Sequence, residues 1–145
     1  MSSLALLSVL VASPSVPVEA WKGSLGRSVA EVSRRLGAGK ALVEGARQYR
    51  LAGGVTVVVE WHAGRAESFV FEFARKPRTW QEALARVGLK ADGAKVERGE
   101  RNSFGDRCAY VSGVRGLPKG WLAIFAEGKS NGWLAVQSPN FAAGW

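Results

Sequence analysis

Two runs of alternating apolar residues constrain the fold of this chain more than any other feature. Apolar side chains recur at every second position in residues 55–61 and again in residues 69–73. A period of two is typical of a β-strand that buries one face. Ala63-Gly64-Arg65 lies between the runs and indicates a turn, because glycine tolerates a positive φ. The stretch therefore predicts an antiparallel hairpin.

Capping residues predict two short helices, one before this hairpin and one after it. Ser28 with Glu31, and Thr79 with Glu82, each have the spacing of a capping box. In both segments a glycine follows nine residues after the cap and indicates the end of the helix. The second helix has an apolar stripe made of Trp80, Ala83, Leu84 and Val87.

The helix-and-strand pattern occurs twice in the chain, with an offset of 51 residues between the two caps. Strands are expected at 46–51, 55–61 and 68–73 after the first helix, and at 95–101, 106–113 and 119–125 after the second. We interpret this as a tandem duplication of a helix-plus-three-strand unit, with units at about 24–75 and 76–137. A further hairpin is expected at 130–132, where Asn131-Gly132 is typical of a tight turn, followed by a strand at 133–137.

Together these elements predict an α+β fold. We expect an antiparallel sheet of about six to eight strands with both helices on one face, since such a sheet can leave its other face open to solvent. The chain of 145 residues is long enough for one domain with a substantial core.

The N-terminal segment predicts export. Residues 4–12 are apolar, and Val18-Glu19-Ala20 has the small residues that signal peptidase prefers. The apolar run is too short to span a membrane. No Lys or Arg precedes it, so an apolar first strand or a start site assigned too late are alternatives. We expect residues 1–20 to be a signal peptide, residues 21–145 to form a single α+β domain, and the location to be secreted or periplasmic.

The charge of the chain is strongly basic. Its formal net charge is +8, and removal of Glu19 with the signal would leave 20 basic and 11 acidic residues, a net of +9. Such a charge favours association with anionic envelope polymers or lipids. The basic residues are scattered, apart from Arg34-Arg35 and the cluster at 75–78, so a nucleic-acid groove is not expected.

The residues that carry chemistry are few. His62 is the only histidine, and we expect neither a metal nor a cofactor, because metal sites need several convergent ligands. Cys108 is the only cysteine, which excludes an intramolecular disulfide, and we expect it to be a buried small hydrophobe. The carboxylates of Glu60 and Glu72 are interpreted as part of a solvated sheet face. A small hydrolase that uses His62 and Glu60 is an alternative, but the sequence favours a protein that is not an enzyme.

Part of this pattern resembles known families. The residues concerned are Ser28, Glu31, Leu36-Gly37, 55–60 and Gly64-Arg65, echoed by Thr79, Glu82 and Val87-Gly88. A capped helix before a hairpin with a Gly-Arg turn resembles the unit of small outer-membrane assembly lipoproteins of the SmpA/OmlA type. Two such units in tandem resemble the β-lactamase inhibitor protein fold. The lipobox cysteine and the inhibitors' paired cysteines are absent, so the resemblance, over residues 21–137, implies an exported binding scaffold rather than β-lactamase inhibition.

The predicted function is binding of an unidentified envelope or secreted protein by the open sheet face. We select candidate contacts by their position in the alternation of each strand and by their aromatic or charged side chains. They are Arg50, Glu60, His62, Tyr110, Trp121 and Trp133. At least one of the two tryptophans is expected in the core, because tryptophan is highly buried on average. The alternative, binding of an anionic envelope polymer or lipid, would weaken steeply with added salt.

The export hypothesis makes a direct prediction about the native protein. We expect its N-terminus to be Trp21, because cleavage after Ala20 satisfies the small-residue preference of signal peptidase. An intact-mass measurement on protein from the native cells tests this. A mass that includes residues 1–20 would contradict it.

Overall fold

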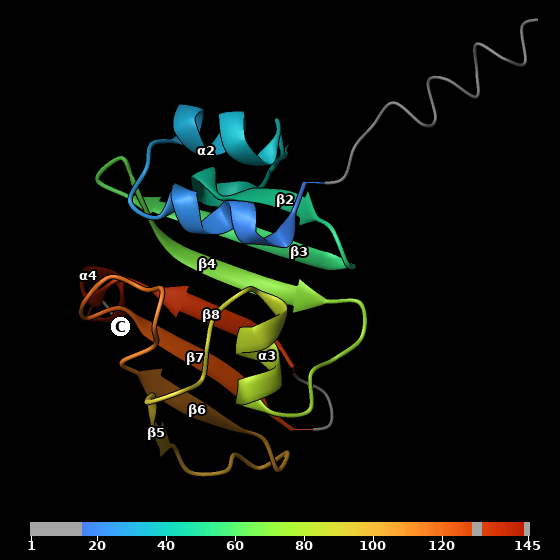
Figure 1. Cartoon of the computed structure of the whole chain (residues 1–145), viewed down its shortest axis with the longest axis vertical. Helices are drawn as coiled ribbons and strands as arrows, with labels where there is room; N and C mark the ends of the chain where they lie inside the picture. The colour runs from blue at the N-terminus through green and yellow to red at the C-terminus, as the bar shows by residue number, and fades with distance from the viewer. Residues whose placement is uncertain (1–15, 129–131, 144–145) are drawn as a thin grey trace, which may run out of the picture.

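Eight strands form one antiparallel sheet in the computed structural model of the protein, which describes residues 16–128 and 132–143 (Figure 1). The strands are β1 (Lys40–Ala41), β2 (Arg47–Leu51), β3 (Val55–His62), β4 (Arg65–Phe73), β5 (Lys95–Arg98), β6 (Arg107–Ser112), β7 (Leu122–Glu127) and β8 (Leu134–Gln137). The helices are η1 (Val18–Ser24), α2 (Val29–Leu36), η2 (Val43–Gly45), α3 (Trp80–Arg86) and α4 (Pro139–Ala143). The predicted α+β class with an antiparallel sheet is confirmed.

The strand order is β1-β2-β3-β4-β8-β7-β6-β5. The last strand of the chain, β8, therefore lies between β4 and β7, and it joins the two halves of the sheet. Three strands were predicted in each half, but the structure has four. β1 was missed because two residues show no periodicity, and β8 lies where a strand at 133–137 was expected.

The predicted hairpin is formed by β3 and β4. Val57 and Val59 of β3 and Phe69 and Phe71 of β4 are fully buried, so the apolar alternation does face the core. The turn residues Ala63 and Gly64 have φ values of 51° and 76°. Positive φ at both central residues is the geometry that suits a two-residue hairpin turn.

Both predicted helices begin at the predicted caps. The Ser28 hydroxyl accepts a hydrogen bond from the Glu31 amide at 3.3 Å, and the Thr79 hydroxyl accepts one from the Glu82 amide at 3.1 Å. The Glu82 carboxylate accepts hydrogen bonds from the Arg78 amide and the Arg86 guanidinium, and these lower its pKa.

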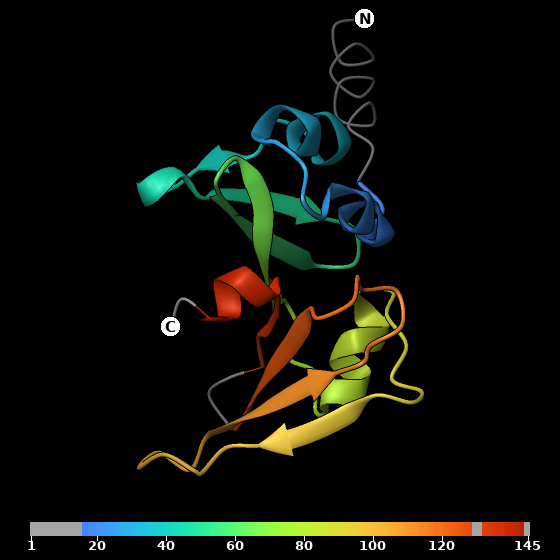
Figure 2. The same cartoon turned by 90° about the vertical axis from the view of Figure 1, so that its left-hand side faces the viewer.

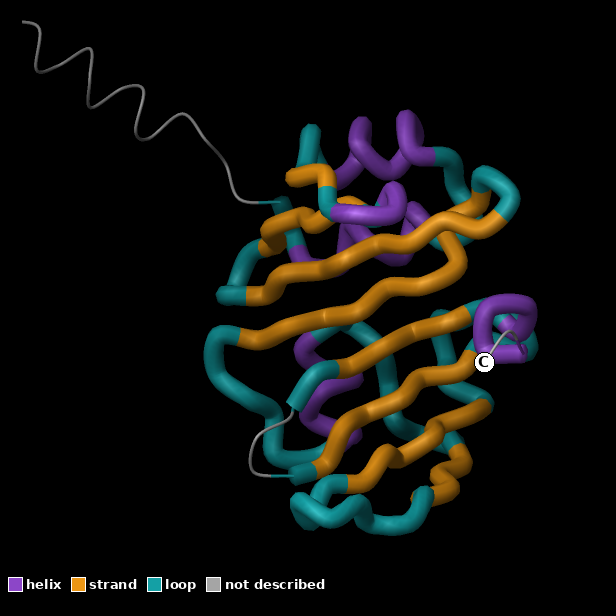
Figure 3. Tube along the Cα trace, turned by 180° about the vertical axis from the view of Figure 1, so that it is seen from behind, coloured by secondary structure: helices purple, strands orange, loops and turns teal. Residues whose placement is uncertain are grey.

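The helices do not all lie on one side of the sheet. Figure 2 shows η1 and α3 on one side and α4 on the other, and Figure 3 shows most of that second side free of helices. The sequence predicted two helices, both on one face, whereas the structure has further helices and α4 lies on the other side. α4 replaces a predicted tail because Pro139 begins it and the Ser138 hydroxyl accepts a hydrogen bond from the Phe141 amide at 3.1 Å.

Some predicted elements fall outside the described residues. These are residues 130–131 of the hairpin turn expected at 130–132, and the apolar run at residues 4–12. Among residues 16–128 and 132–143, every helix is too short or too polar to cross a bilayer. The predicted cleavage site after Ala20 lies inside η1.

Trp21 of η1 is buried at 0% exposure under the middle of the sheet. Its ring centroid lies 5.5 Å from that of Phe69 and 4.9 Å from that of Phe71. The indole Nε1 donates a hydrogen bond to the Val87 carbonyl at 2.8 Å, just after α3, and the Lys22 ammonium donates to the Gly88 carbonyl. One residue thus connects the N-terminal segment, β4 and the end of α3.

This arrangement predicts separable costs for packing and hydrogen bonding at Trp21. Trp21→Ala is expected to lower the free energy of unfolding by about 3–5 kcal/mol, because it leaves a large cavity. Trp21→Phe keeps an aromatic ring but leaves the Val87 carbonyl unpaired, which costs about 1–3 kcal/mol. Urea unfolding measures both values.

The matched control is Phe104→Ala, which removes an aromatic ring that is 86% exposed. It should change the free energy of unfolding by less than about 0.5 kcal/mol. A comparably small change for Trp21→Ala would contradict the role given to Trp21.

Candidate binding face

The sheet face opposite η1 and α3, which we call the open face, has two chemically different parts. Over β2, β3 and β4 the side chains that alternate with core residues are mostly polar, whereas over β6, β7 and β8 they are mostly apolar. The polar part consists of Gln48, Arg50, Thr56, Val58, Glu60, Ser68, Val70 and Glu72. Two of these residues are valines, and Ser68 is buried at 0% exposure, so the solvated residues are the other five. A solvated polar surface needs no covering, so the apolar part is the distinctive feature of this face.

The apolar part contains a hollow of about 390 Å³, which we call the apolar hollow. It is lined by Cys108, Tyr110, Leu122, Ile124, Trp133, Ala135 and Gln137. The strand register explains how it forms, because Ile124 lies opposite Tyr110 on one side and opposite Ala135 on the other. The small side chain of Ala135, beside Ile124, leaves a depression next to larger side chains. The Tyr110 side chain stands at its rim, since this residue is 41% exposed.

The structure separates the six residues selected from the sequence into three groups. Tyr110 and Trp133 both line the apolar hollow. Arg50, Glu60 and His62 lie on β2 and β3 in the other half of the sheet. Five strand spacings separate β2 from β6, a distance of about 24 Å.

Trp121 does not belong to the open face. It packs against the core, and its ring centroid lies 6.4 Å from that of Phe69. Its selection as an open-face contact was therefore wrong. Trp121 comes just before β7 and alternates with the core-facing residues Ala123 and Phe125, whereas its neighbour Leu122 points to the open face. Trp121 is partly buried against the core, where at least one of Trp121 and Trp133 was expected.

The polar residues of the first half do not converge on one point. Glu60 lies opposite Ser68 and Glu72 lies opposite Thr56, so the backbones of the two glutamates are four residues apart along the strands, about 13 Å. Carboxylate pairs in glycosidases are closer than about 9.5 Å. Within the described residues, no group of three or more His, Cys, Asp or Glu side chains could hold a metal ion. The hydrolase alternative based on His62 and Glu60 stays a prediction.

Sequence reasoning missed most of the residues that line the apolar hollow. Leu122, Ile124 and Ala135 are neither aromatic nor charged, although their alternation with core residues marked the opposite face. Cys108 is half-buried and lines the hollow rather than the core, which corrects the expectation that it is a buried core residue. Burial, together with the negative charge of Glu127, raises the pKa of the Cys108 thiol.

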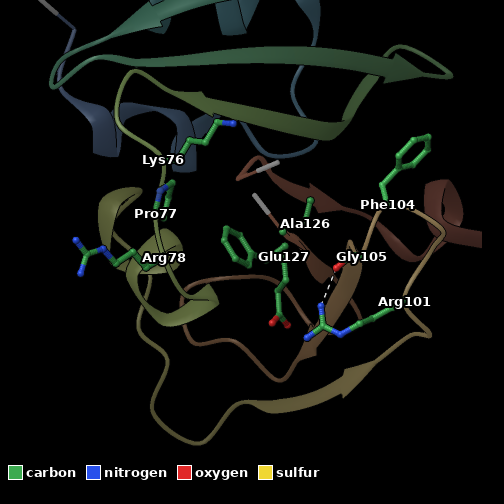
Figure 4. Close-up of a pocket in the computed structure, with 10 residues that line it drawn as sticks. Lys76, Pro77, Arg78, Arg101, Phe104, Gly105, Ala126 and Glu127 are labelled. Carbon is green, nitrogen blue, oxygen red and sulfur yellow. Dashed lines mark hydrogen bonds between the residues drawn. The ribbon is translucent and has the colours of Figure 1, made fainter. Parts of the chain in front are cut away.

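A second, larger pocket of about 730 Å³ lies between the segment after β4, the loop before β6 and the end of β7 (Figure 4). Lys76, Arg78 and Arg101 line it together with one carboxylate, that of Glu127. Figure 4 shows Arg78 and Phe104 on opposite sides of this basic pocket. The Arg101 guanidinium donates a hydrogen bond to the Gly105 carbonyl at 2.7 Å. Gly128, the last described residue before 129–131, also lines the pocket.

Comparison of the chain with protein-family models, with curated proteins and with solved structures gave no match. The resemblance to the assembly lipoproteins and to the β-lactamase inhibitor protein fold is therefore an untested proposal.

The position of Cys108 predicts low thiol reactivity in the folded protein. A raised pKa leaves less thiolate at neutral pH, and the thiolate is the reactive form. Alkylation by iodoacetamide should be slower in the native protein than in urea. Glu127→Gln should speed the native reaction, because it removes one of the two causes of the raised pKa. A native rate equal to the rate in urea would contradict this account.

Proposed function

We propose that this protein is an exported, non-enzymatic binding module that holds a protein partner on its open face. The observation that carries the proposal is the apolar hollow, which combines Tyr110 and Trp133 on a side of the sheet that few other elements cover. Aromatic residues in a depression are typical of interaction hot spots. The polar residues around Arg50 and Glu72 would then form a solvated rim.

The hollow also indicates what the partner presents. Its lining is mainly apolar, and its hydrogen-bonding groups are the Gln137 amide, the Tyr110 hydroxyl, the Trp133 indole N–H and the weakly bonding Cys108 thiol. A protruding aliphatic or aromatic side chain fits this chemistry. We expect such an anchor on the partner, surrounded by polar groups that face β2 to β4.

We further propose that the fold arose by duplication of a helix-plus-strand unit, as in the tandem families that the sequence resembles. The strand order supports this, because β4 and β8 are neighbours at the centre while β1 and β5 lie at the two edges. In this arrangement β4 corresponds to β8 and β2 to β6. The sequence pattern had matched β2 with β5, β3 with β6 and β4 with β7. Each of these matches is shifted by one strand, because β1 was missed.

A second candidate function is the binding of an anionic envelope polymer or lipid. The observation that favours it is the basic pocket, where three cationic residues and one carboxylate line the same surface. The net charge of +8 supports the same idea. Such binding would be electrostatic and exposed, so it would be screened by salt.

The proposed function predicts one residue on which capture depends. Immobilised protein is exposed to envelope and secreted fractions at low and high salt, and retained proteins are identified. Tyr110→Ala should weaken binding of the retained partner by about tenfold or more, because truncation of a hot spot costs about 2 kcal/mol or more. Val29→Ala is the matched control, since Val29 is 38% exposed but lies on α2.

The outcomes separate the two candidate functions. A partner that is retained at both salt levels and lost with Tyr110→Ala supports the open-face proposal. Capture of polymer only at low salt, unchanged by Tyr110→Ala and weakened by Arg78→Gln, would overturn it in favour of polyanion binding. Equal effects of Tyr110→Ala and Val29→Ala would also contradict a role for the hollow.

A further inference from the structure

A β-bulge near the start of β4 places an acidic side chain in an unusual position. Trp61 lies opposite Ala66 and Glu60 lies opposite Ser68, so Glu67 has no residue opposite it on β3. A bulge of this kind redirects a side chain out of the regular alternation of a strand. The bulge therefore places the Glu67 side chain outside the regular alternation between the two faces of the sheet.

Glu67 lines a notch of about 290 Å³ at the ends of β4, β7 and β8, which we call the Glu67 notch. Trp121, Ser138 and Pro139 line it as well, together with Arg65 and Asn140. Among the described residues, it shares no lining residue with the apolar hollow. An inference about this notch is therefore independent of the proposed role of the hollow.

The Glu67 side chain is almost completely buried and incompletely paired. Glu67 is 7% exposed, and its Oε2 atom has no hydrogen-bond partner among residues 16–128 and 132–143. Within the same residues, Arg65 forms no ion pair with Glu67, although it lines the notch. A buried carboxylate without a partner is costly, so such a group in a pocket indicates a place for an opposite charge.

We propose that the Glu67 notch binds a compact cationic group, a guanidinium or a primary ammonium, carried by a peptide. Glu67 supplies the charge-assisted hydrogen bond to this cation. The indole of Trp121 forms an aromatic wall on which a guanidinium can stack. The notch, at about 290 Å³, lies at the lower end of the range of ligand pockets, which is about 300–1,000 Å³. A single arginine or lysine side chain matches both its size and its charge.

The test compares two probes of nearly equal size that differ in charge, acetyl-arginine methylamide and acetyl-citrulline methylamide. Each is titrated into the full-length protein, and the Trp121 indole signal is followed by NMR. The arginine probe should give saturable shifts at Trp121, and the citrulline probe should bind at least about tenfold more weakly.

Variants with the same change of charge locate the site. Glu67→Gln should weaken binding of the arginine probe by at least about tenfold, because it removes the counter-charge while keeping the shape. Glu72→Gln is the matched control, since it neutralises an exposed carboxylate on the same strand, and it should leave binding unchanged. Arg65→Gln should leave binding unchanged or strengthen it, because it removes a competing positive charge.

Several results would overturn the proposal. One is equal binding of the arginine and citrulline probes, and another is the absence of saturable shifts with either. A third is loss of stability with Arg65→Gln and Glu67→Gln that is equal and non-additive, which would make Arg65 the counter-ion of Glu67. Because the probe comparison uses the unmodified protein, it stands even if a variant does not fold.

Discussion

The packing of Trp21 is the interaction on which the rest of the structure depends. Its indole lies against Phe69 and Phe71 of β4 and donates a hydrogen bond to Val87 at the end of α3. β4 pairs with β8, so the strand against which Trp21 packs is hydrogen-bonded directly to the second half of the sheet. The buried residues accordingly form one core that extends under both halves, rather than two separate ones.

The side chains on the other face of the sheet are not needed for packing in this core. η1 and α3 cover one side, so every second side chain of β2 to β4 and of β6 to β8 is committed to packing, while the alternate side chains are free to differ. Over β2 to β4 they are polar, and over β6 to β8 they are apolar. The contrast matters for function because an apolar depression in an otherwise uncovered face is a place where another molecule can displace water.

The two candidate sites differ in how well the sequence could predict them. Tyr110 and Trp133 were identified from parity and aromatic character, but their apolar neighbours Ile124 and Ala135 carry no functional signature of their own. Glu67 could not be identified at all. A bulge is a single extra residue opposite a specific partner strand, and the alternation of β4 shows no sign of it until the register with β3 is known.

The sequence by itself determined the local elements: the β3–β4 hairpin, through a period of two on either side of a short turn, and the helices α2 and α3, through their caps. These depend on residues close together in the chain. Only the tertiary structure decided that β8 lies between β7 and β4, that Trp121 joins the core, and that Glu67 lines a notch. Each of these results from pairing or packing between segments that are distant in sequence, which no local pattern records.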